Sequence, residues 1–556
     1  MLKTNSLRSL SSLFWPNLLK FIALIILFRG ATVKSQTTIY TAKRIYTMDT
    51  GLRVCESMVA EKGRILFTGS LDTARRLYPE ANLVQFKNRF IYPGFIDAHC
   101  HFLAWCRGLK ECNLIGTKSE QEVISRLKKY ASTTTRSWIV GRGWDQNDWP
   151  QKNFPGIENL DKAFPDKPVC LKRIDGHAVW INSAAVKALN LDLNKNIPGG
   201  EIVKINGKFS GILVDNAADL VLPFVPDLPR QEMNEAVRMG AQQCYAVGLT
   251  TLDEAGLDLK DIYYIDSLQQ NKMLKMRIYA MLAASEKSFS WIGANNTMRT
   301  ERLHVGGVKF YLDGALGSRG ALLKKDYCDR LGHKGLLLQN VQQFTNYCSF
   351  AGSKGYQICV HAIGDSANSI ALNVFGKIQP AGFDNRWRIE HAQVVDPKEF
   401  SLFKKFKVIP SVQPTHATSD GAWAENRLCS SRMTGAYNYA ELGRQAGLLA
   451  LGTDFPVEDI SPIKTFYSAV FRVDMKSDKT NPFMPDGGLK PVQALLGMTI
   501  WAAYANKEEH EKGSLENGKL ADFVVLNTDL LEAEQKQVAK TRVTATYING
   551  EKVFGK

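Results

Sequence analysis

The chain has 556 residues, an ordinary apolar share and a formal net charge of +15 at pH 7. A chain of this length is too long to fold around one simple hydrophobic core. It suits a large α/β barrel with a smaller companion domain. Part of the basic excess lies in residues 1–35, which contain Lys and Arg but no acid. Elsewhere basic residues are scattered among acids and form no block that would follow a phosphate backbone, so we expect no nucleic-acid partner.

Residues 1–35 have the pattern of a targeting segment. Basic residues precede the apolar run 21–28, which suits the core of a signal peptide and is short for a membrane-spanning helix. We favour cleavage after Ala31 or Ser35, and the alternative is an uncleaved signal anchor, supported by further apolar residues upstream. The protein is therefore expected in the secretory pathway or outside the cytoplasm, and it contacts a membrane only through this segment if the segment is uncleaved.

Strand-like segments occur at both ends of the remaining chain. Short apolar runs joined by turns lie within residues 38–69, and two more lie within residues 521–553, the last with an Asn-Gly turn. Neither end has enough strands to bury a core by itself. We therefore predict that residues 36–92 and 505–556 meet in one small β-sandwich beside the central domain.

The central residues 93–504 alternate buried-type strands with helical stretches, as expected of a parallel sheet with crossover helices. The interval 102–248 is too long for one crossover, so it is predicted to contain a lid inserted after the first strand. The pattern predicts a closed (β/α)8 TIM-type barrel. The alternative is an open doubly wound sheet, but no Gly-x-Gly-x-x-Gly motif follows the first strand to support it. After the opening strand, the candidate strands are 249–255, 276–282, 305–312, 357–361, 386–391, 408–413 and 448–454.

Two histidines end the first barrel strand, in Ala98-His99-Cys100-His101. Side chains alternate along a strand, so His99 and His101 point to one side while Cys100 points away. Such a pair can hold a metal ion at two points, although two surface histidines on a strand are the simpler interpretation.

Further polar residues end later strands: Lys309, His361, His391 and Asp454. The carboxyl ends of barrel strands form one face, so these side chains are expected to converge with the two histidines of the first strand. Each alone has an ordinary explanation, because a strand-end histidine is often only hydrogen-bonded and a buried lysine can pair with an acid. Their repetition after the same kind of strand favours a shared site.

These motifs together resemble the amidohydrolase superfamily, and more narrowly its amidohydrolase-3 branch, which includes N-substituted formamide deformylases. The resemblance extends over nearly the whole chain after the leader. It is specific for the family but not for the substrate. The matching segments are Pro93–His101, Asp175–His177, Lys309 with Asp313–Ala321, His361–Asp365, Ile389–Gln393, Ser411–Pro414, Gly452–Val457 and Gly513–Asp522.

The resemblance implies a pair of divalent metal ions, with Zn²⁺ preferred and Fe²⁺ or Mn²⁺ as alternatives. It implies that Lys309 bridges the two ions as a carbamate; otherwise Lys309 forms an ion pair or contacts substrate beside a single ion. The implied ligands are His99, His101 and Asp454 on one ion and His361 and His391 on the other.

The same resemblance implies hydrolysis of an amide by metal-activated hydroxide, with Asp454 carrying the proton to the departing nitrogen. The expected substrate contacts are His177 and Trp144 of the insertion and His416 after the seventh strand. Two of these have a simpler interpretation, since Trp144 could be lid core and His416 an ordinary loop histidine. We favour His177 over both, because Asp175-Gly176-His177 belongs to the family pattern.

The sequence therefore predicts a metal-dependent amidohydrolase that cleaves a non-peptide C–N bond of a small-molecule amide. The alternatives are a non-catalytic binding or regulatory barrel, and a deaminase or isomerase on the same scaffold. A homodimer is compatible with the sequence. The ten cysteines are dispersed and mostly of the buried type, and Cys106 with Cys112 is a candidate pair in an oxidising compartment.

Overall fold

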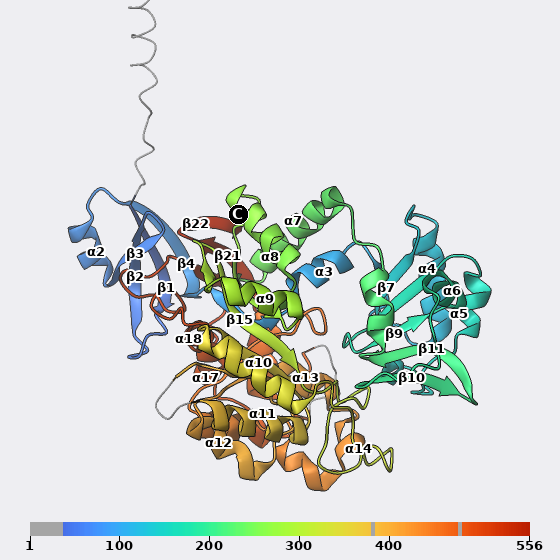
Figure 1. Cartoon of the computed structure of the whole chain (residues 1–556). Coiled ribbons are helices and arrows are strands. Elements are labelled where there is room, and N and C mark those ends of the chain that lie inside the picture. Colours follow the sequence, from blue (N-terminus) through green and yellow to red (C-terminus); the bar gives the residue numbers. More distant parts are fainter. Residues whose placement is uncertain (1–36, 380–383, 476–480, 556) are drawn as a thin grey trace, which may run out of the picture.

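The computed structural model describes residues 37–379, 384–475 and 481–555 (Figure 1). The prediction for residues 1–35 lies outside these residues. Eight parallel strands form the central sheet, and the predicted (β/α)8 barrel is confirmed. In order of neighbours they are β5 (Phe95–Cys100), β12 (Leu249–Leu257), β13 (Arg277–Ala283), β15 (Leu303–Tyr311), β16 (Gln357–Ala362), β17 (Arg388–His391), β18 (Ile409–Val412) and β19 (Ala450–Leu451). The short strand β14 (Met298–Arg299) pairs with β15.

The barrel closes where the chain beyond β19 meets the end of β5. The backbone nitrogen of Asp454 donates to the carbonyl of His99 at 2.7 Å, and the nitrogen of His101 donates to the carbonyl of Phe455 at 2.8 Å. Three of the four residues in these hydrogen bonds, His99, His101 and Asp454, are predicted to bind metal.

A buried carboxylate and a glycine support this seam. Asp97 accepts from the backbone nitrogen of Thr453 at 2.9 Å and from its hydroxyl at 2.6 Å. A Cβ at Gly452 would lie 2.5 Å from the backbone nitrogen of His99, a distance shorter than Cβ atoms show in real proteins. Glycine is therefore required at this point of the seam.

Helices cover the outside of the barrel. In α10 (Val341–Ser353), Phe344, Cys348 and Ala351 recur at helical spacing and are buried, and the side chain of Asn340 caps the first turn. The apolar stripe thus sets which side of α10 faces the barrel. The other covering helices include α7 (Arg230–Ala246), α8 (Leu259–Gln270), α9 (Glu286–Ala294), α11 (Asp365–Ile378), α12 (Phe400–Lys405), α15 (Tyr439–Ala446), α16 (Pro462–Phe471), α17 (Pro491–Gly497) and α18 (Ile500–Ala505).

The two chain ends share one seven-stranded sheet, drawn blue and red in Figure 1. Strand β4 joins them, because it pairs with β1 in parallel and with β20 in antiparallel orientation. Only Gly94 separates β4 from barrel strand β5, so this sheet is tied directly to the first metal-binding strand. Its strands, in order, are β22 (Glu551–Gly555), β21 (Val543–Ile548), β20 (Phe523–Leu526), β4 (Asn82–Pro93), β1 (Thr38–Tyr46), β2 (Val54–Glu61) and β3 (Arg64–Gly69).

The insertion after β5 forms a separate six-stranded sheet with its own apolar core, drawn teal beside the barrel in Figure 1. It is narrower than residues 102–248, because α3 (Phe102–Gly108) and α7 contribute side chains to the barrel core instead. Its strands are β10 (Gly200–Ile205), β11 (Lys208–Asp215), β9 (Ala178–Ile181), β8 (Val169–Arg173), β7 (Ile139–Trp144) and β6 (Cys112–Asn113), and its helices are α4 (Glu120–Ala131), α5 (Glu158–Ala163) and α6 (Ser183–Leu189). We call this unit the inserted domain.

A disulfide joins Cys328 to Cys429, with a Cα–Cα distance of 5.8 Å. It links the loop after β15 to the segment after α14 (Ala424–Leu428). The candidate pair Cys106 and Cys112 is wrong, since both are free and buried in different apolar clusters.

Among the described residues, no helix is both long enough and apolar enough to cross a membrane.

A buried ion pair connects the barrel to the sheet of the chain ends. Arg277 on β13 donates to Asp522 at 2.6 and 3.2 Å, and both side chains are almost fully buried. We expect Asp522→Ala to lower the free energy of unfolding by about 3–5 kcal/mol, because it leaves a buried charge without its partner. Thermal unfolding measures this as a lower transition temperature.

The exposed pair of Lys260 and Asp227 provides the control, because its side chains are 62% and 65% exposed. Asp227→Ala should cost at most about 1 kcal/mol. Equal shifts for Asp227→Ala and Asp522→Ala would contradict the assigned role of the buried pair.

Candidate metal centre

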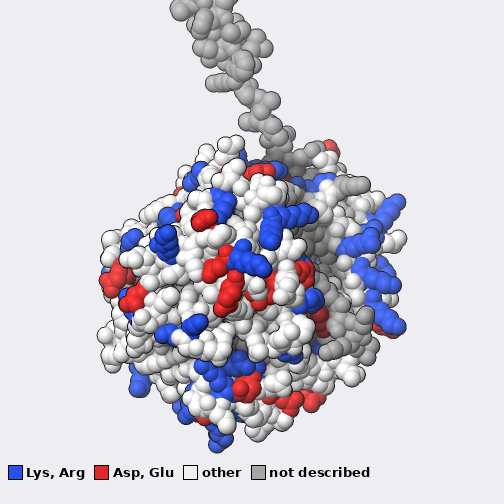
Figure 2. All heavy atoms as spheres, turned by 90° about the vertical axis from the view of Figure 1, so that its right-hand side faces the viewer, with Lys and Arg blue, Asp and Glu red and all other residues white. Residues whose placement is uncertain are grey.

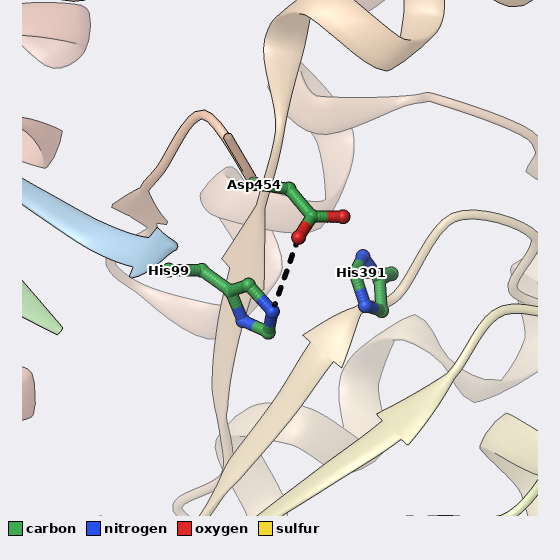
Figure 3. Close-up of side chains that lie close together, drawn as sticks. All are labelled: His99, His391 and Asp454. Carbon is green, nitrogen blue, oxygen red and sulfur yellow. Dashed lines mark ion pairs between the residues drawn. The ribbon is translucent and has the colours of Figure 1, made fainter. Parts of the chain in front are cut away.

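Three predicted ligands form a compact group at the carboxyl end of the barrel. His99 from β5, His391 from β17 and Asp454 after β19 each offer one atom within 4.8 Å of the others (Figure 3). The Nε2 atom of His99 lies 3.6 Å from Oδ1 of Asp454. All three side chains are buried, so they would hold an ion away from bulk water.

His101 and Lys309 adjoin this group. Nε2 of His101 lies 3.2 Å from Oδ1 of Asp454, and Nζ of Lys309 lies 3.2 Å from Nε2 of His99. His101 is the more accessible, with 26% of its side chain exposed, whereas Lys309 is buried. Both therefore lie close enough to share one centre with His99 and Asp454.

His361 lies beside the group but does not join it. Its ring centroid is 4.4 Å from that of His391, yet its Nε2 atom is 3.5 Å from both the carbonyl of Gly314 and Oδ1 of Asp313. The described geometry therefore brings together one cluster of ligands, and His361 lies next to that cluster.

Buried acceptors orient the ligand histidines. Nδ1 of His99 lies 2.5 Å from Oε2 of Glu390, and Nδ1 of His391 lies 2.8 Å from Oε1 of Gln413. Occupying Nδ1 in this way leaves Nε2 of each ring to face the site, as in most protein metal centres.

The Glu390 carboxylate is itself held by Arg388, whose guanidinium donates to it at 2.7 and 3.1 Å. Burial opposes ionisation of Glu390, but Arg388 and then His99 hold its pKa well below the usual range. Sequence reasoning missed these two roles. The signal was present, because Arg388 and Glu390 lie two residues apart in strand Arg388–His391 with the apolar Ile389 between them. Side chains two residues apart in a strand point to the same side, here into the barrel.

The protonation states suit metal binding. Burial lowers the pKa of His99 to about 4, with the charge of Lys309 adding to the effect, and burial lowers the pKa of His391 and His361 well below the ordinary value. These imidazoles are therefore neutral at pH 7 and retain a lone pair for a ligand bond. Burial also lowers the pKa of Lys309, to about 8.

Two of the ligands adopt an unusual backbone conformation. His391 has a φ of 74° and Asp454 a φ of 60°, both in the left-handed region. Residues other than glycine adopt this region at a cost of about 1–3 kcal/mol, and they keep it only where surrounding structure enforces it. The barrel seam and the loop after β17 thus hold these side chains in place.

A cavity of about 920 Å³ opens above the group, between the barrel and the inserted domain. His177 and His416 both line it, together with His101, His391 and Asp454 of the candidate ligands. Nε2 of His416 is 3.6 Å from Oδ2 of Asp454, and the ring stacks beside His391 with centroids 5.9 Å apart. Both histidines therefore lie where a substrate could contact them.

Trp144 does not lie in this cavity, and the structure contradicts its expected substrate contact. Its side chain is fully buried in the core of the inserted domain, and its Nε1 donates to the carbonyl of Leu171 at 2.9 Å. Its neighbours Gly143 and Asp145 line the cavity instead. Arg142, two residues earlier in β7, also lines the cavity, and the strand register shifts between Arg142 and Trp144, where Gly143 has a φ of 99°. This irregularity turns the indole to the apolar side.

The donor set fits a divalent metal ion. Oδ1 of Asp454 and Nε2 of His416 are buried without a hydrogen-bond partner among the described residues. A buried carboxylate oxygen is costly without a cation or donor, and neutral imidazole nitrogens with a carboxylate are ligands that Zn²⁺ and related ions accept. His99, His391, Asp454 and the adjacent His101 would hold such an ion.

Residues 83–554 match the model of the amidohydrolase family, and the chain belongs to this family. The match extends over the barrel and over β4, β20, β21 and β22 of the sheet of the chain ends. The candidate metal site described above agrees with the hydrolysis that the family name implies. The protein is thus a member of a hydrolase family whose structural relatives depend on metal.

Three comparisons show how similar the chain is to known proteins. The Arabidopsis thaliana protein LONG AFTER FAR-RED 3 is 31% identical over 92% of this chain and 90% of its own length. An N-substituted formamide deformylase of Arthrobacter pascens is 23% identical over 91% and 96%. The crystal structure of an uncharacterized metal-dependent hydrolase from Pyrococcus horikoshii superposes with a TM-score of 0.75 at 26% identity, covering 90% of this chain and 99% of that chain.

The acceptors behind the ligands provide a test of the centre. We expect Glu390→Gln to weaken metal affinity about 10–100-fold, because it replaces the charged acceptor that orients His99. Chelator competition followed by metal analysis measures this, and Gln413→Leu tests the corresponding acceptor of His391. The exposed His510, with 90% of its side chain accessible, gives the control His510→Ala. Unchanged affinity in Glu390→Gln and Gln413→Leu would contradict the centre.

Proposed function

We propose that the protein hydrolyses a non-peptide amide C–N bond in a small molecule. The observation that carries this proposal is the buried cluster of His99, His391 and Asp454 beneath a cavity large enough for a small substrate. Family membership supports hydrolysis, and the similarity to a formamide deformylase supports the choice of amide bond.

A bound divalent ion would supply an activated water and would polarise the substrate carbonyl. The chain supplies the proton transfer: Asp454 accepts the proton of the attacking water and returns it to the departing nitrogen. His416, next to Oδ2 of Asp454, is placed to contact the substrate on that side. Residues of the inserted domain, among them His177, line one side of the cavity.

Lys309 is proposed to bind metal only after carbamylation. An ammonium group cannot ligate a cation, whereas reaction of the neutral amine with CO₂ forms an N–C bond, releases one proton and leaves an anionic carboxylate. Its position 3.2 Å from His99 Nε2 would place that carboxylate beside the cluster. If two ions bind, we propose that His391 joins Lys309 and His361 on the second ion, which leaves His99, His101 and Asp454 on the first. Zn²⁺ is our first choice for both.

We expect Asp454→Asn to lower kcat by about 10²–10⁴-fold, the usual contribution of a positioned proton-transfer group. The measurement is turnover of the metal-loaded protein on N-formyl and N-acyl amines, cyclic amides and esters. Asp227→Asn, on the exposed surface, should retain full activity.

Activity that survives Asp454→Asn would refute the proposed mechanism. Release of ammonia from an aromatic amine, without amide cleavage by the same protein, would favour a deaminase. Stoichiometric metal with no turnover on the panel would favour a binding protein.

The substrate is proposed to be a small molecule rather than a nucleic acid. Basic and acidic side chains are mixed over the centre of the face drawn in Figure 2, although basic ones follow one another along its right edge. The mixed charge around the centre supports this choice.

We also propose that the protein acts in an oxidising compartment, as its leader predicts. The disulfide between Cys328 and Cys429 supports this, because such bonds persist mainly outside the reducing cytosol. A non-reducing peptide map of protein from its native compartment should contain one linked peptide pair, with Cys106 and Cys112 as free thiols. Free thiols at Cys328 and Cys429 in that protein would contradict the proposed compartment.

A further inference from the structure

The inserted domain presents a histidine–carboxylate pair to the barrel site. The register of β9 and β11 sets Val214 opposite Ala178, so the next residues, Asp215 and His177, face each other at the sheet end. The backbone nitrogen of Asp215 donates to the carbonyl of His177 at 2.8 Å, and Nδ1 of His177 lies 2.7 Å from Oδ1 of Asp215. Asp215 thus holds both the backbone and the ring of His177.

The Asp215 carboxylate is enclosed by the barrel. A Cβ at Gly314 would lie 2.5 Å from Oδ1, and a Cβ at Gly320 would lie 2.5 Å from Oδ2. Both glycines belong to the loop that follows β15, the strand that carries Lys309. The loop therefore leaves a notch, defined here by Gly314 and Gly320, that only the carboxylate of Asp215 fills.

Two further features single out Asp215. Its φ is 49°, in the left-handed region shared by His391 and Asp454, and its side chain is fully buried. Its Oδ2 atom has no hydrogen-bond partner among the described residues. A buried carboxylate with only one strong partner is costly to maintain, which argues that orienting His177 is its purpose.

His177 in turn reaches the reaction site. Its ring centroid lies 5.1 Å from that of His361, and 17% of its side chain is exposed to the cavity. Since Nδ1 is covered by Asp215, the edge that carries Nε2 is the one left for the cavity. The nitrogen that faces the cavity is thus fixed by Asp215, a residue of the inserted domain whose own side chain is fully buried.

We propose that Asp215 is a positioning residue that holds His177 against the substrate, so that seating the inserted domain in the glycine notch completes the active site. This inference rests on the proposed hydrolase function for its substrate. His177 contacts the substrate, and Asp215 acts only through His177.

The first test needs no substrate. In protein labelled with ¹⁵N-histidine, the hydrogen-bonded Nδ1 proton of His177 should give a slowly exchanging, downfield resonance that His177→Gln removes and thereby assigns. Asp215→Ala should abolish this resonance while metal content and unfolding temperature stay near those of the unmodified protein. Persistence of the resonance in Asp215→Ala would overturn the proposal. Loss of metal in Asp215→Ala would also overturn it, because His177 would then be a ligand.

The second test uses the best substrate of the amide panel. His177→Gln and Asp215→Ala should each lower kcat/KM by about 10–100-fold, with Asp215→Asn in between, and the double variant should lose no more than His177→Gln alone. Additive losses would mean that Asp215 acts independently of His177, and would refute the proposal. If no substrate is turned over by the unmodified protein, the hydrolase function fails while the resonance still tests the pair.

A pair of glycine variants tests the notch without altering Asp215. Gly314→Ala should disturb the carboxylate and reproduce the loss of the His177 resonance, because its methyl group would occupy the space of Oδ1. Gly293→Ala is the matched control, since the nearest atom to its Cβ is 3.7 Å away and its site lies on the exposed side of α9. If Gly314→Ala and Gly293→Ala gave the same His177 resonance, the proposed role of the glycine notch would be refuted.

Discussion

The guanidinium of Arg388 is the interaction on which the interior of the barrel depends. It is fully buried and donates to Glu390 on its own strand, to Asp253 on β12 at 3.0 Å and to the carbonyl of Ala98 on β5 at 2.5 Å. It also reaches Ser411 on β18 at 3.2 Å. An arginine buried with this many fixed partners ties together strands that are not neighbours in the sheet.

This network also sets the chemistry of the site. Arg388 keeps Glu390 ionised, and Glu390 holds Nδ1 of His99, so Nε2 of His99 faces Asp454. The same two ligands form the hydrogen bond that closes the barrel, from the nitrogen of Asp454 to the carbonyl of His99. The backbone contact that closes the barrel therefore also fixes the separation of two candidate metal ligands. A change that loosens the seam would separate the ligands even if every ligand were retained.

Much of this could be predicted from the sequence. Strand periodicity located all eight barrel strands, and His99, His391 and Asp454 converge because strand ends share one face. The expected substrate contact of Trp144 was wrong because an irregularity at Gly143 interrupts the alternation of side chains in β7 and places the indole in the core of the inserted domain. Asp215 was missed because its role depends on the pairing of β9 with β11, a contact between residues far apart in sequence that no local pattern contains.

The candidate metal ligands and the candidate substrate contact His177 come from different parts of the fold. The candidate metal ligands must keep fixed mutual distances, and they lie on barrel strands or directly after them, where backbone hydrogen bonds determine their positions. His177 lies instead on a turn of the inserted domain, and its link to the barrel is the contact of Asp215 with Gly314 and Gly320. Because a barrel tolerates changes in its loops far better than in its strands, substrate choice can vary through this contact while the metal centre stays the same.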